Sequence, residues 1–181
     1  MEEYFDILDE AGHKTGQSIP RSQAHREGQW HRSVHIWVVD EWERILLQQR
    51  SLHKDSNPGL WDISSAGHIS AGQESREAAV REVNEELGLI IASERLQFLF
   101  EDKDEAILNN GTFIDHEFHD IYLLRLQRGE DRLIKPDPGE LAGVRWISPE
   151  VFADELRSQP QYFVMHSHEY PKILGLFDVK L

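Results

Sequence analysis

Apolar residues alternate or gather in short runs along this 181-residue chain, as β-strands require. The segment 33–39 is rich in β-branched and aromatic residues, which is typical of a central strand. Turn-forming residues at 9–16, 40–43 and 56–59 separate several of these runs. The pattern predicts strands at 4–8, 33–39, 44–49, 61–64, 96–101, 117–126 and 143–147.

Helical spacing of apolar residues appears in two places. In segment 74–87 the residues Ala78, Val83 and Leu87 fall on one helix face, and Gly88 follows as a C-cap. Ser148-Pro149-Glu150 combines an N-cap, an N1 proline and a first-turn acid, so a helix is expected to run to about 158. The segment 161–181 is partly apolar and predicts a short helix followed by a tail. Mixed strands and helices favour an α/β or α+β sandwich with a mixed sheet.

Length and composition restrict the class of protein. A chain of this length predicts one domain over 1–181. With no cysteine, disulfides, thiolate metal sites and a cysteine nucleophile are excluded. The net charge of −14 argues against nucleic-acid and anionic-membrane partners. The acidic N-terminus is unlike a signal peptide and no apolar run is long enough for a membrane helix, which predicts a cytoplasmic protein.

Three acids carry the clearest chemical signal. Glu82, Glu85 and Glu86 stand at i, i+3 and i+4, so a helix would place them on one face. Clustered carboxylates suit a hard divalent cation such as Mg²⁺. A solvated acidic face with a Glu77–Arg81–Glu85 ladder explains the same spacing, and the spacing alone does not separate the two.

The surrounding stretch, 67–89, resembles the Nudix box. All but one of the fixed positions of that pattern are in register, and these are Gly67, Arg81, Glu82, Val83, Glu85, Glu86, Gly88 and Leu89. The departure is Gln73, which stands where the family has Glu. Gln73 can still hydrogen-bond Arg81, but without charge. Leu46 to Arg50 and Trp146-Ile147-Ser148 also resemble segments of the family.

The resemblance implies a Nudix α/β/α sandwich with a mixed β-sheet: a core over about 30–160, an N-terminal strand and hairpin over 1–29, and a C-terminal helix and tail over 148–181. It also implies metal-dependent hydrolysis of a diphosphate, with Mg²⁺ as cofactor and Mn²⁺ as a substitute. Glu82, Arg81 and Glu85 would be catalytic. The implied metal-binding residues are Gly67, Glu82, Glu85, Glu86 and Glu117, the last of these lying outside the box.

A second resemblance, within the same superfamily, is to type I isopentenyl-diphosphate isomerase. It rests on Arg50 to Lys54, Pro58 to Trp61, Gly67-His68 and the positions that would match the isomerase's metal ligands, namely His25, His31, His68, Asp115 and Glu117. The spacing from His25 to His31 is one residue shorter than in the isomerase. Arg50 and Lys54 would hold the diphosphate, and His68 would line the substrate site. The isomerase's catalytic cysteine is replaced by Ala66.

These observations favour a Nudix hydrolase acting on a small nucleoside diphosphate derivative or another organic diphosphate. An isomerase-like enzyme and a non-catalytic ligand-binding module are the alternatives, and the missing cysteine disfavours the first. His35 is interpreted as a structural histidine, and Glu140 as a weaker candidate metal ligand. His166 and His168 receive no role. A homodimer is compatible with the N-terminal strand and the many aromatic residues.

Overall fold

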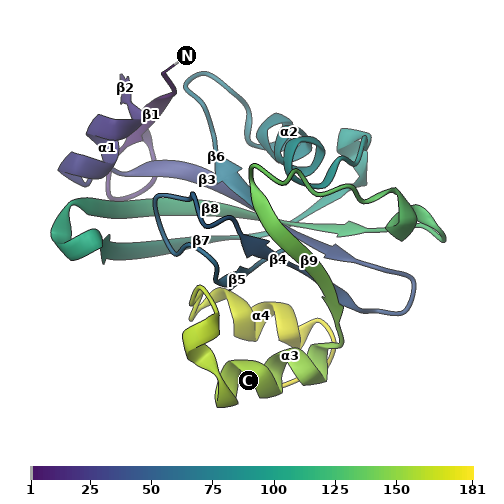
Figure 1. Cartoon of the computed structure of the whole chain (residues 1–181). Coiled ribbons are helices and arrows are strands. Elements are labelled where there is room, and N and C mark those ends of the chain that lie inside the picture. The colour runs from purple at the N-terminus through teal and green to yellow at the C-terminus, as the bar shows by residue number, and fades with distance from the viewer. Residues whose placement is uncertain (1) are drawn as a thin grey trace.

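A mixed sheet forms the centre of the molecule (Figure 1). The structure, a computed structural model, describes residues 2–181; Met1, part of the predicted N-terminal segment 1–29, lies outside them. The sheet has the strand order β5-β4-β3-β8-β7, with β6 on β3 and β9 on β4. Its strands are β3 (His31–Val39), β4 (Ile45–Arg50), β5 (Trp61–Asp62), β6 (Ser65–His68), β7 (Leu96–Leu108), β8 (Phe113–Arg125) and β9 (Leu141–Ile147).

Helices cover both faces of the sheet (Figure 1). Helix α2 (Ser75–Leu87) packs Ala78, Val83 and Leu87 on one face and ends at Gly88, whose φ of 68° suits glycine. Helices α3 (Pro149–Ser158) and α4 (Glu169–Gly175) cover the other face. The prediction of an α/β/α sandwich with a mixed sheet is therefore confirmed. A separate hairpin of β1 (Tyr4–Leu8) and β2 (Lys14–Pro20) leads into α1 (Arg21–Glu27).

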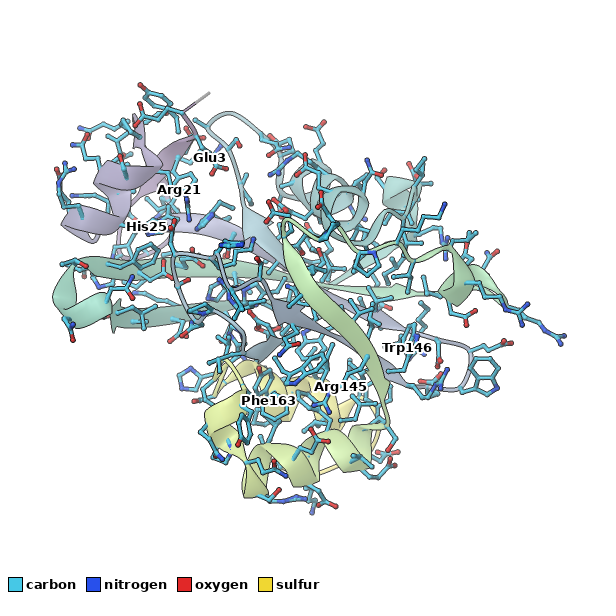
Figure 2. All side chains as sticks on the ribbon, in the orientation of Figure 1. Glu3, Arg21, His25, Arg145, Trp146 and Phe163 are labelled. Atoms are coloured by element: carbon cyan, nitrogen blue, oxygen red, sulfur yellow. The ribbon has the colours of Figure 1, made fainter. Side chains whose placement is uncertain are left out.

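Strand alternation separates the two hydrophobic clusters. On β3, Val34 and Ile36 face α2, whereas Trp37 and Val39 face α3 and α4. The same division holds on β9, where Trp146 packs toward the α2 side and Arg145 stacks over Trp61 at 4.3 Å on the α3 side (Figure 2). The face under α3 and α4 is apolar at Trp37 and turns polar toward His31. Ser33 and His35, in this polar part of β3, line a cleft.

The structure corrects several element boundaries. Strand β8 begins at Phe113, so Glu117 lies within the strand and does not open it. His68 ends strand β6, which the predicted strand at 61–64 does not include. Helix α1 was not predicted, because it has only seven residues and Ala24 is the one apolar residue among them, so no helical apolar spacing marks it. Antiparallel pairing of the consecutive strands β7 and β8, up to Leu108 opposite Phe113, extends both strands beyond their apolar segments.

Candidate functional site

A cleft of about 1020 Å³ runs along strand β6. Its walls come from α2, from the polar ends of β3 and β8, from the segment 50–62 and from the C-terminal segment 163–166. Alternation along β6 gives the cleft two sides: Ser65 and Gly67 face α2, whereas Ala66 and His68 face the opposite side of the sheet.

The α2 side presents two buried carboxylates. Glu82 is 8% exposed and Glu86 is 3% exposed, while Glu85 is exposed one turn away. Glu86 Oε2 accepts hydrogen bonds from Ser65 Oγ at 2.7 Å and from the Ala66 amide at 3.1 Å. Glu82 lies against Gly67 so closely that a Cβ on residue 67 would stand 2.0 Å from Glu82 Oε1. The helix therefore brings all three predicted acids to the cleft, and Gly67 provides the space for Glu82.

Arg81 links these acids to the preceding loop. Its guanidinium contacts Glu82 Oε1 at 2.7 Å and Glu85 Oε2 at 2.9 Å, and it donates to the His68 carbonyl at 2.9 Å. The contact to Gln73 Oε1 is longer, at 3.4 Å. Gln73 therefore retains the expected hydrogen bond to Arg81 as a weak, uncharged one.

The charge balance of this side fits a divalent cation. Burial raises the pKa of Glu82 to about 8, although Arg81 opposes the shift, and burial raises the pKa of Glu86 to about 7. Arg81 pairs with Glu82 and Glu85, and within residues 2–181 Glu86 is bonded to Ser65 and the Ala66 amide but to no guanidinium group. Oxygen donors on one helical face are the ligands that Mg²⁺ takes, and a bound cation would relieve the burial penalty.

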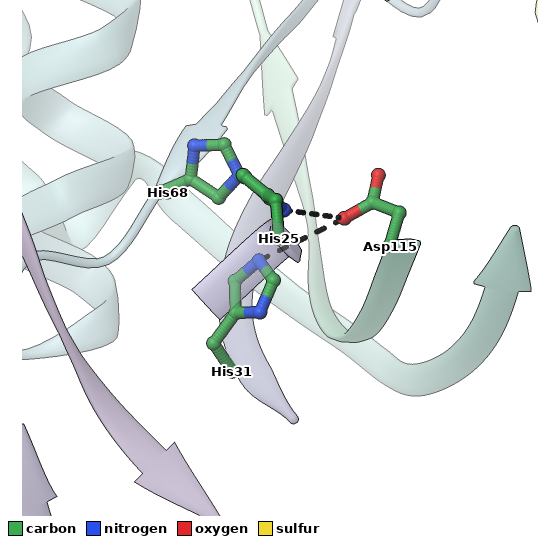
Figure 3. Close-up of side chains that lie close together, drawn as sticks. All are labelled: His25, His31, His68 and Asp115. Atoms are coloured by element: carbon green, nitrogen blue, oxygen red, sulfur yellow. Dashed lines mark ion pairs between the residues drawn. The ribbon is translucent and has the colours of Figure 1, made fainter. Parts of the chain in front are cut away.

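The opposite side of β6 carries a histidine group, here called the His25 cluster: His25, His31, His68 and Asp115 (Figure 3). His25 comes from α1, His31 from β3, His68 from β6 and Asp115 from β8. Their candidate ligand atoms all lie within 4.8 Å of one another. Asp115 Oδ1 is 3.5 Å from His25 Nδ1 and 3.8 Å from His31 Nε2. Three separate stretches of the chain, around 25–31, 68 and 115, thus meet at one point.

Unpartnered buried atoms indicate what the His25 cluster could hold. Both ring nitrogens of His25 and one oxygen of Asp115 are buried and have no hydrogen-bond partner among the described residues. Such groups are costly unless something coordinates them. Burial and the neighbouring Glu117 carboxylate raise the pKa of Asp115 to about 9, which again reflects missing positive charge. Imidazole and carboxylate donors fit a divalent metal ion.

Glu117 joins this cluster to the rest of the cleft. Its Oε1 lies 2.8 Å from His68 Nε2 and 3.0 Å from His31 Nε2, and its Oε2 accepts from Ser33 Oγ at 3.0 Å. Burial opposes ionisation of Glu117, but the two histidines outweigh it and hold the pKa of this carboxyl well below its usual range. The structure therefore places Glu117 among the histidines with which the isomerase resemblance grouped it. The α2 acids, with which the Nudix resemblance also grouped it, lie across β6.

The predicted diphosphate-binding residues line the cleft but already have partners. Arg50 donates to Asp62 at 3.1 Å and to the Ser56 carbonyl at 3.1 Å, and Lys54 forms an ion pair with Glu140. Both residues are partly buried on one wall. Arg21, on α1, contributes a cation that sequence reasoning missed, and it pairs with Asp55 at 3.3 Å (Figure 2).

Other cleft residues also escaped the sequence interpretation. Ser33, His35, His119 and His166 all line the cleft, although His35 had been taken as structural and His166 had received no role. His35 is buried and bonded to Glu169, as a structural histidine would be. The signal that could have revealed the others is spacing by two: Ser33 and His35 alternate on one strand, and Glu117 and His119 on another.

The chain is similar in sequence to proteins of one known family. The sequence model described as "NUDIX domain" matches residues 29–166. Nudix hydrolase 3 of Arabidopsis thaliana is 40% identical over 98% of this chain, and this chain spans only 23% of that relative's length. An isopentenyl-diphosphate Delta-isomerase of Nocardia farcinica is 32% identical, with 86% of this chain and 85% of the relative covered.

Solved structures show the same fold at low identity. DR0079 from Deinococcus radiodurans aligns with a TM-score of 0.64 and 23% identity, covering 87% of this chain and 90% of that protein. The NUDIX domain of Shewanella oneidensis NrtR, solved with ADP ribose, aligns with a TM-score of 0.54 and 14% identity over 81% of this chain and 85% of its own. Among residues 2–181, no helix has the length and apolar character needed to cross a bilayer.

Proposed function

The chain belongs to the Nudix family, and from this premise we propose that it hydrolyses the diphosphate linkage of a small nucleoside diphosphate derivative or other organic diphosphate. The observation that carries the proposal is the pair of buried acids Glu82 and Glu86, set beside Glu85 and held by Arg81 and the β6 backbone in the wall of the cleft. A binding module without catalysis would not need to retain buried carboxylates that destabilise the unligated fold.

In this proposal the acids of the α2 side bind the metal ion, and Gly67 and Arg81 keep those acids in position. Glu82, Glu85 and Glu86 would hold Mg²⁺, for which Mn²⁺ can substitute, and Gly67 keeps the space in front of Glu82 open. When bound, the cation neutralises the charge that develops on the diphosphate and lowers the pKa of the attacking water. Glu82 accepts the proton of that water. Arg81 fixes the directions of Glu82 and Glu85 and binds the loop at His68.

Basic side chains of the cleft would position the substrate. Arg50 and Lys54 line the cleft, and Arg21 stands at the N-terminal end of α1. Because Arg50 and Lys54 are held by Asp62 and Glu140, a diphosphate must compete with carboxylates for both cations. This competition favours a substrate that arrives together with metal, which removes part of its negative charge. His68, at the end of β6, would add an imidazole to the substrate-binding surface of the cleft.

An isomerase-like reaction is the second candidate, because the His25 cluster joins the residues that match the isomerase's metal ligands. Where a metal fits, His25, His31, His68, Asp115 and Glu117 would hold it. Moving a proton at an alkene carbon also needs an acid or base within hydrogen-bond reach of that carbon. Ala66, which lines the cleft immediately before Gly67, supplies none. We therefore favour hydrolysis.

A screen of metal-stripped protein against a diphosphate library, with and without Mg²⁺, tests the proposal. The library should contain nucleoside diphosphate derivatives and prenyl diphosphates. We expect at least one compound to release phosphate products only when Mg²⁺ or Mn²⁺ is present. In water enriched in ¹⁸O, one product phosphate should carry the label, since water attacks phosphorus. Hydrolysis that persists in excess chelator, or no metal-dependent turnover of any compound, would contradict it.

A further inference from the structure

The buried carboxylate of Asp62 bonds two basic side chains of the cleft at once. Asp62 Oδ2 accepts from Arg50 Nη1 at 3.1 Å, and Asp62 Oδ1 lies 2.9 Å from His166 Nε2. The Ile63 amide donates to Asp62 Oδ1 at 2.8 Å and so fixes the carboxylate on the backbone that follows it. Asp62, Arg50 and His166 all line the cleft. One acid therefore holds a guanidinium and an imidazole side by side.

Three parts of the chain meet at this carboxylate. Arg50 and Asp62 are the last residues of β4 and β5, which pair antiparallel. His166 comes from the C-terminal segment, 104 residues beyond Asp62. This segment runs beside β5 because the Val164 amide donates to the Trp61 carbonyl at 2.9 Å. A tertiary contact thus brings His166 to the two strands, which explains why the local sequence pattern gave it no role.

His166 carries a positive charge at neutral pH. Burial opposes protonation of its ring, but the hydrogen bond to Asp62 and the charges of Asp62 and Glu169 outweigh burial and raise the pKa of His166 to about 9. Asp62 stays ionised, because His166 and Arg50 overcome its burial and hold the pKa of this carboxyl well below its usual range. Two cations therefore face one carboxylate, and the group keeps an excess of positive charge.

The neighbouring titratable groups leave this charge in place. Those that face His166 are His35, Asp62, Asp104, His119, Glu169 and Tyr170. Burial lowers the pKa of His119 to about 3 and raises that of Tyr170 well above its usual range, so both are uncharged at neutral pH. His35 Nδ1 lies 2.7 Å from Glu169 Oε2, and Asp104 adds negative charge from β7. A loss of positive charge near pH 9 at this position is therefore that of His166.

Both basic groups keep N–H donors that the fold does not use. Arg50 donates with three N–H groups, to Asp62, to the Ser56 carbonyl and to Ser56 Oγ, and a guanidinium has five. Within residues 2–181, His166 Nδ1 takes part in no hydrogen bond, and it is not one of the fully enclosed polar atoms. The His166 side chain is 12% exposed and lines the cleft. Its protonated ring can therefore donate from Nδ1 to a group bound there.

We propose that Arg50 and His166, held together by Asp62, form a two-cation site that binds an anionic phosphate group of the substrate. A guanidinium bonds phosphate oxygens with parallel N–H groups, and an imidazolium adds one charged donor beside it. Lys54, by contrast, forms its ion pair with a carboxylate of its own, that of Glu140. The identity of the anion rests on the proposed function. The inference adds His166 to the substrate-binding residues and makes Asp62 a positioning residue for both cations.

Binding of imidodiphosphate, a diphosphate analogue whose P–N–P bridge resists hydrolysis, tests this site without turnover. The full-length protein is titrated with the analogue by calorimetry at pH 7 in the presence of Mg²⁺. His166→Gln keeps an N–H for Asp62 but removes the charge, so we expect the affinity to fall by about 10–100-fold, as the loss of one charged hydrogen bond predicts. His168→Gln, at an exposed position of the same segment, should leave the affinity unchanged.

The pH profile separates anion binding from a purely structural role of the pair Asp62 and His166. Dividing the affinity of the unmodified chain by that of His166→Gln removes the titration of the analogue itself. We expect this ratio to be large at pH 7 and to fall toward one as the pH rises through about 9, where the imidazolium loses its proton. Asp62→Asn removes the partner that raises this pKa, so in that background the fall should move to lower pH. A pair that only fastens the C-terminal segment would change stability and leave the ratio near one at every pH.

Two results would overturn the proposal: equal affinity of a folded His166→Gln variant and the unmodified chain, or no binding of imidodiphosphate by the unmodified chain. Circular dichroism checks the fold. If the variant does not fold, the ring ¹⁵N resonances of His166 are followed in the unmodified chain, where the Nδ1 signal should shift on saturation with the analogue, and an unmoved signal refutes the site. Binding that depends on His166, together with no hydrolysis in the diphosphate screen, would contradict only the proposed function.

Discussion

Strand β6 separates two metal-compatible sides that differ in how the chain builds them. Toward α2, Ser65 and Gly67 face carboxylates that come from one continuous helix. Toward the other side, Ala66 and His68 face histidines and acids supplied by α1, β3, β8 and the C-terminal segment. The first side offers oxygen donors and the second mostly nitrogen donors. Because donor type determines ion preference, the proposed function assigns Mg²⁺ to the first side, and the second side would favour borderline divalent ions.

The largest effect should come from the α2 side. Glu82→Gln removes the proposed base and a metal ligand together, so kcat should fall by about 10²–10⁴-fold. Glu86→Gln should cause a comparable loss, since it removes a carboxylate held by Ser65 and Ala66. Glu77→Gln, at an exposed position of the same helix, is the matched control and should retain full turnover. Full activity of either cleft variant would show that hydrolysis does not use this side.

A methyl group at Gly67 should damage the same side through packing. The new Cβ would fall 2.0 Å from Glu82 Oε1, so the carboxylate or the strand must shift. We expect Gly67→Ala to lower the free energy of unfolding by about 1–3 kcal/mol, as overpacking does, and to lower kcat as well. Gly143→Ala adds a Cβ that meets no atom within 4 Å and serves as the control in urea unfolding. Equal stability of the two variants would contradict the close packing.

A substitution in the His25 cluster should not destabilise the metal-free protein, in contrast to Gly67→Ala. His25→Phe removes two unpartnered buried nitrogens and keeps a ring to stack on Phe113, whose centroid lies 4.1 Å away. In metal-free protein the unfolding free energy should stay the same or rise by about 1 kcal/mol. With Zn²⁺ or Mn²⁺ present, the Tm of the unmodified chain should rise more than that of the variant. A metal-free variant that is strongly destabilised, with an undiminished metal-dependent rise, would refute the metal assignment.

The smallest effect concerns the loop that joins the two sides. Gln73→Glu would give Arg81 a charged partner in place of a 3.4 Å neutral contact. We expect kcat to stay within about a few-fold of its value, with any change upward, because a charged hydrogen bond is roughly twice as strong. Gln73→Ala should change kcat in the other direction. A large loss in Gln73→Glu with normal folding would instead assign Gln73 a role in substrate contact.

The two sides also differ in how far sequence could predict them. The α2 acids and Arg81 follow from helical spacing within a single segment, and the sandwich follows from the mixture of strand and helix patterns. The histidine side depends on β3 pairing with β8, which joins His31 to Glu117 across the sheet. Pairing over that separation has no local signal, and His166 lies in an irregular segment. The sequence therefore left Glu117 grouped with both sides.

Which side of β6 determines the reaction is the central question, and isopentenyl diphosphate answers it most directly. The compound carries both a diphosphate, which the α2 side would cleave, and an alkene, which an isomerase would shift. In a proton NMR time course with Mg²⁺, we expect no dimethylallyl methyl signals, and any slow reaction should release phosphate with the vinyl signals of the product alcohol or monophosphate retained. Dimethylallyl signals appearing at an enzymatic rate would contradict the assignment and would require Glu117 or His68 to move protons beside Ala66.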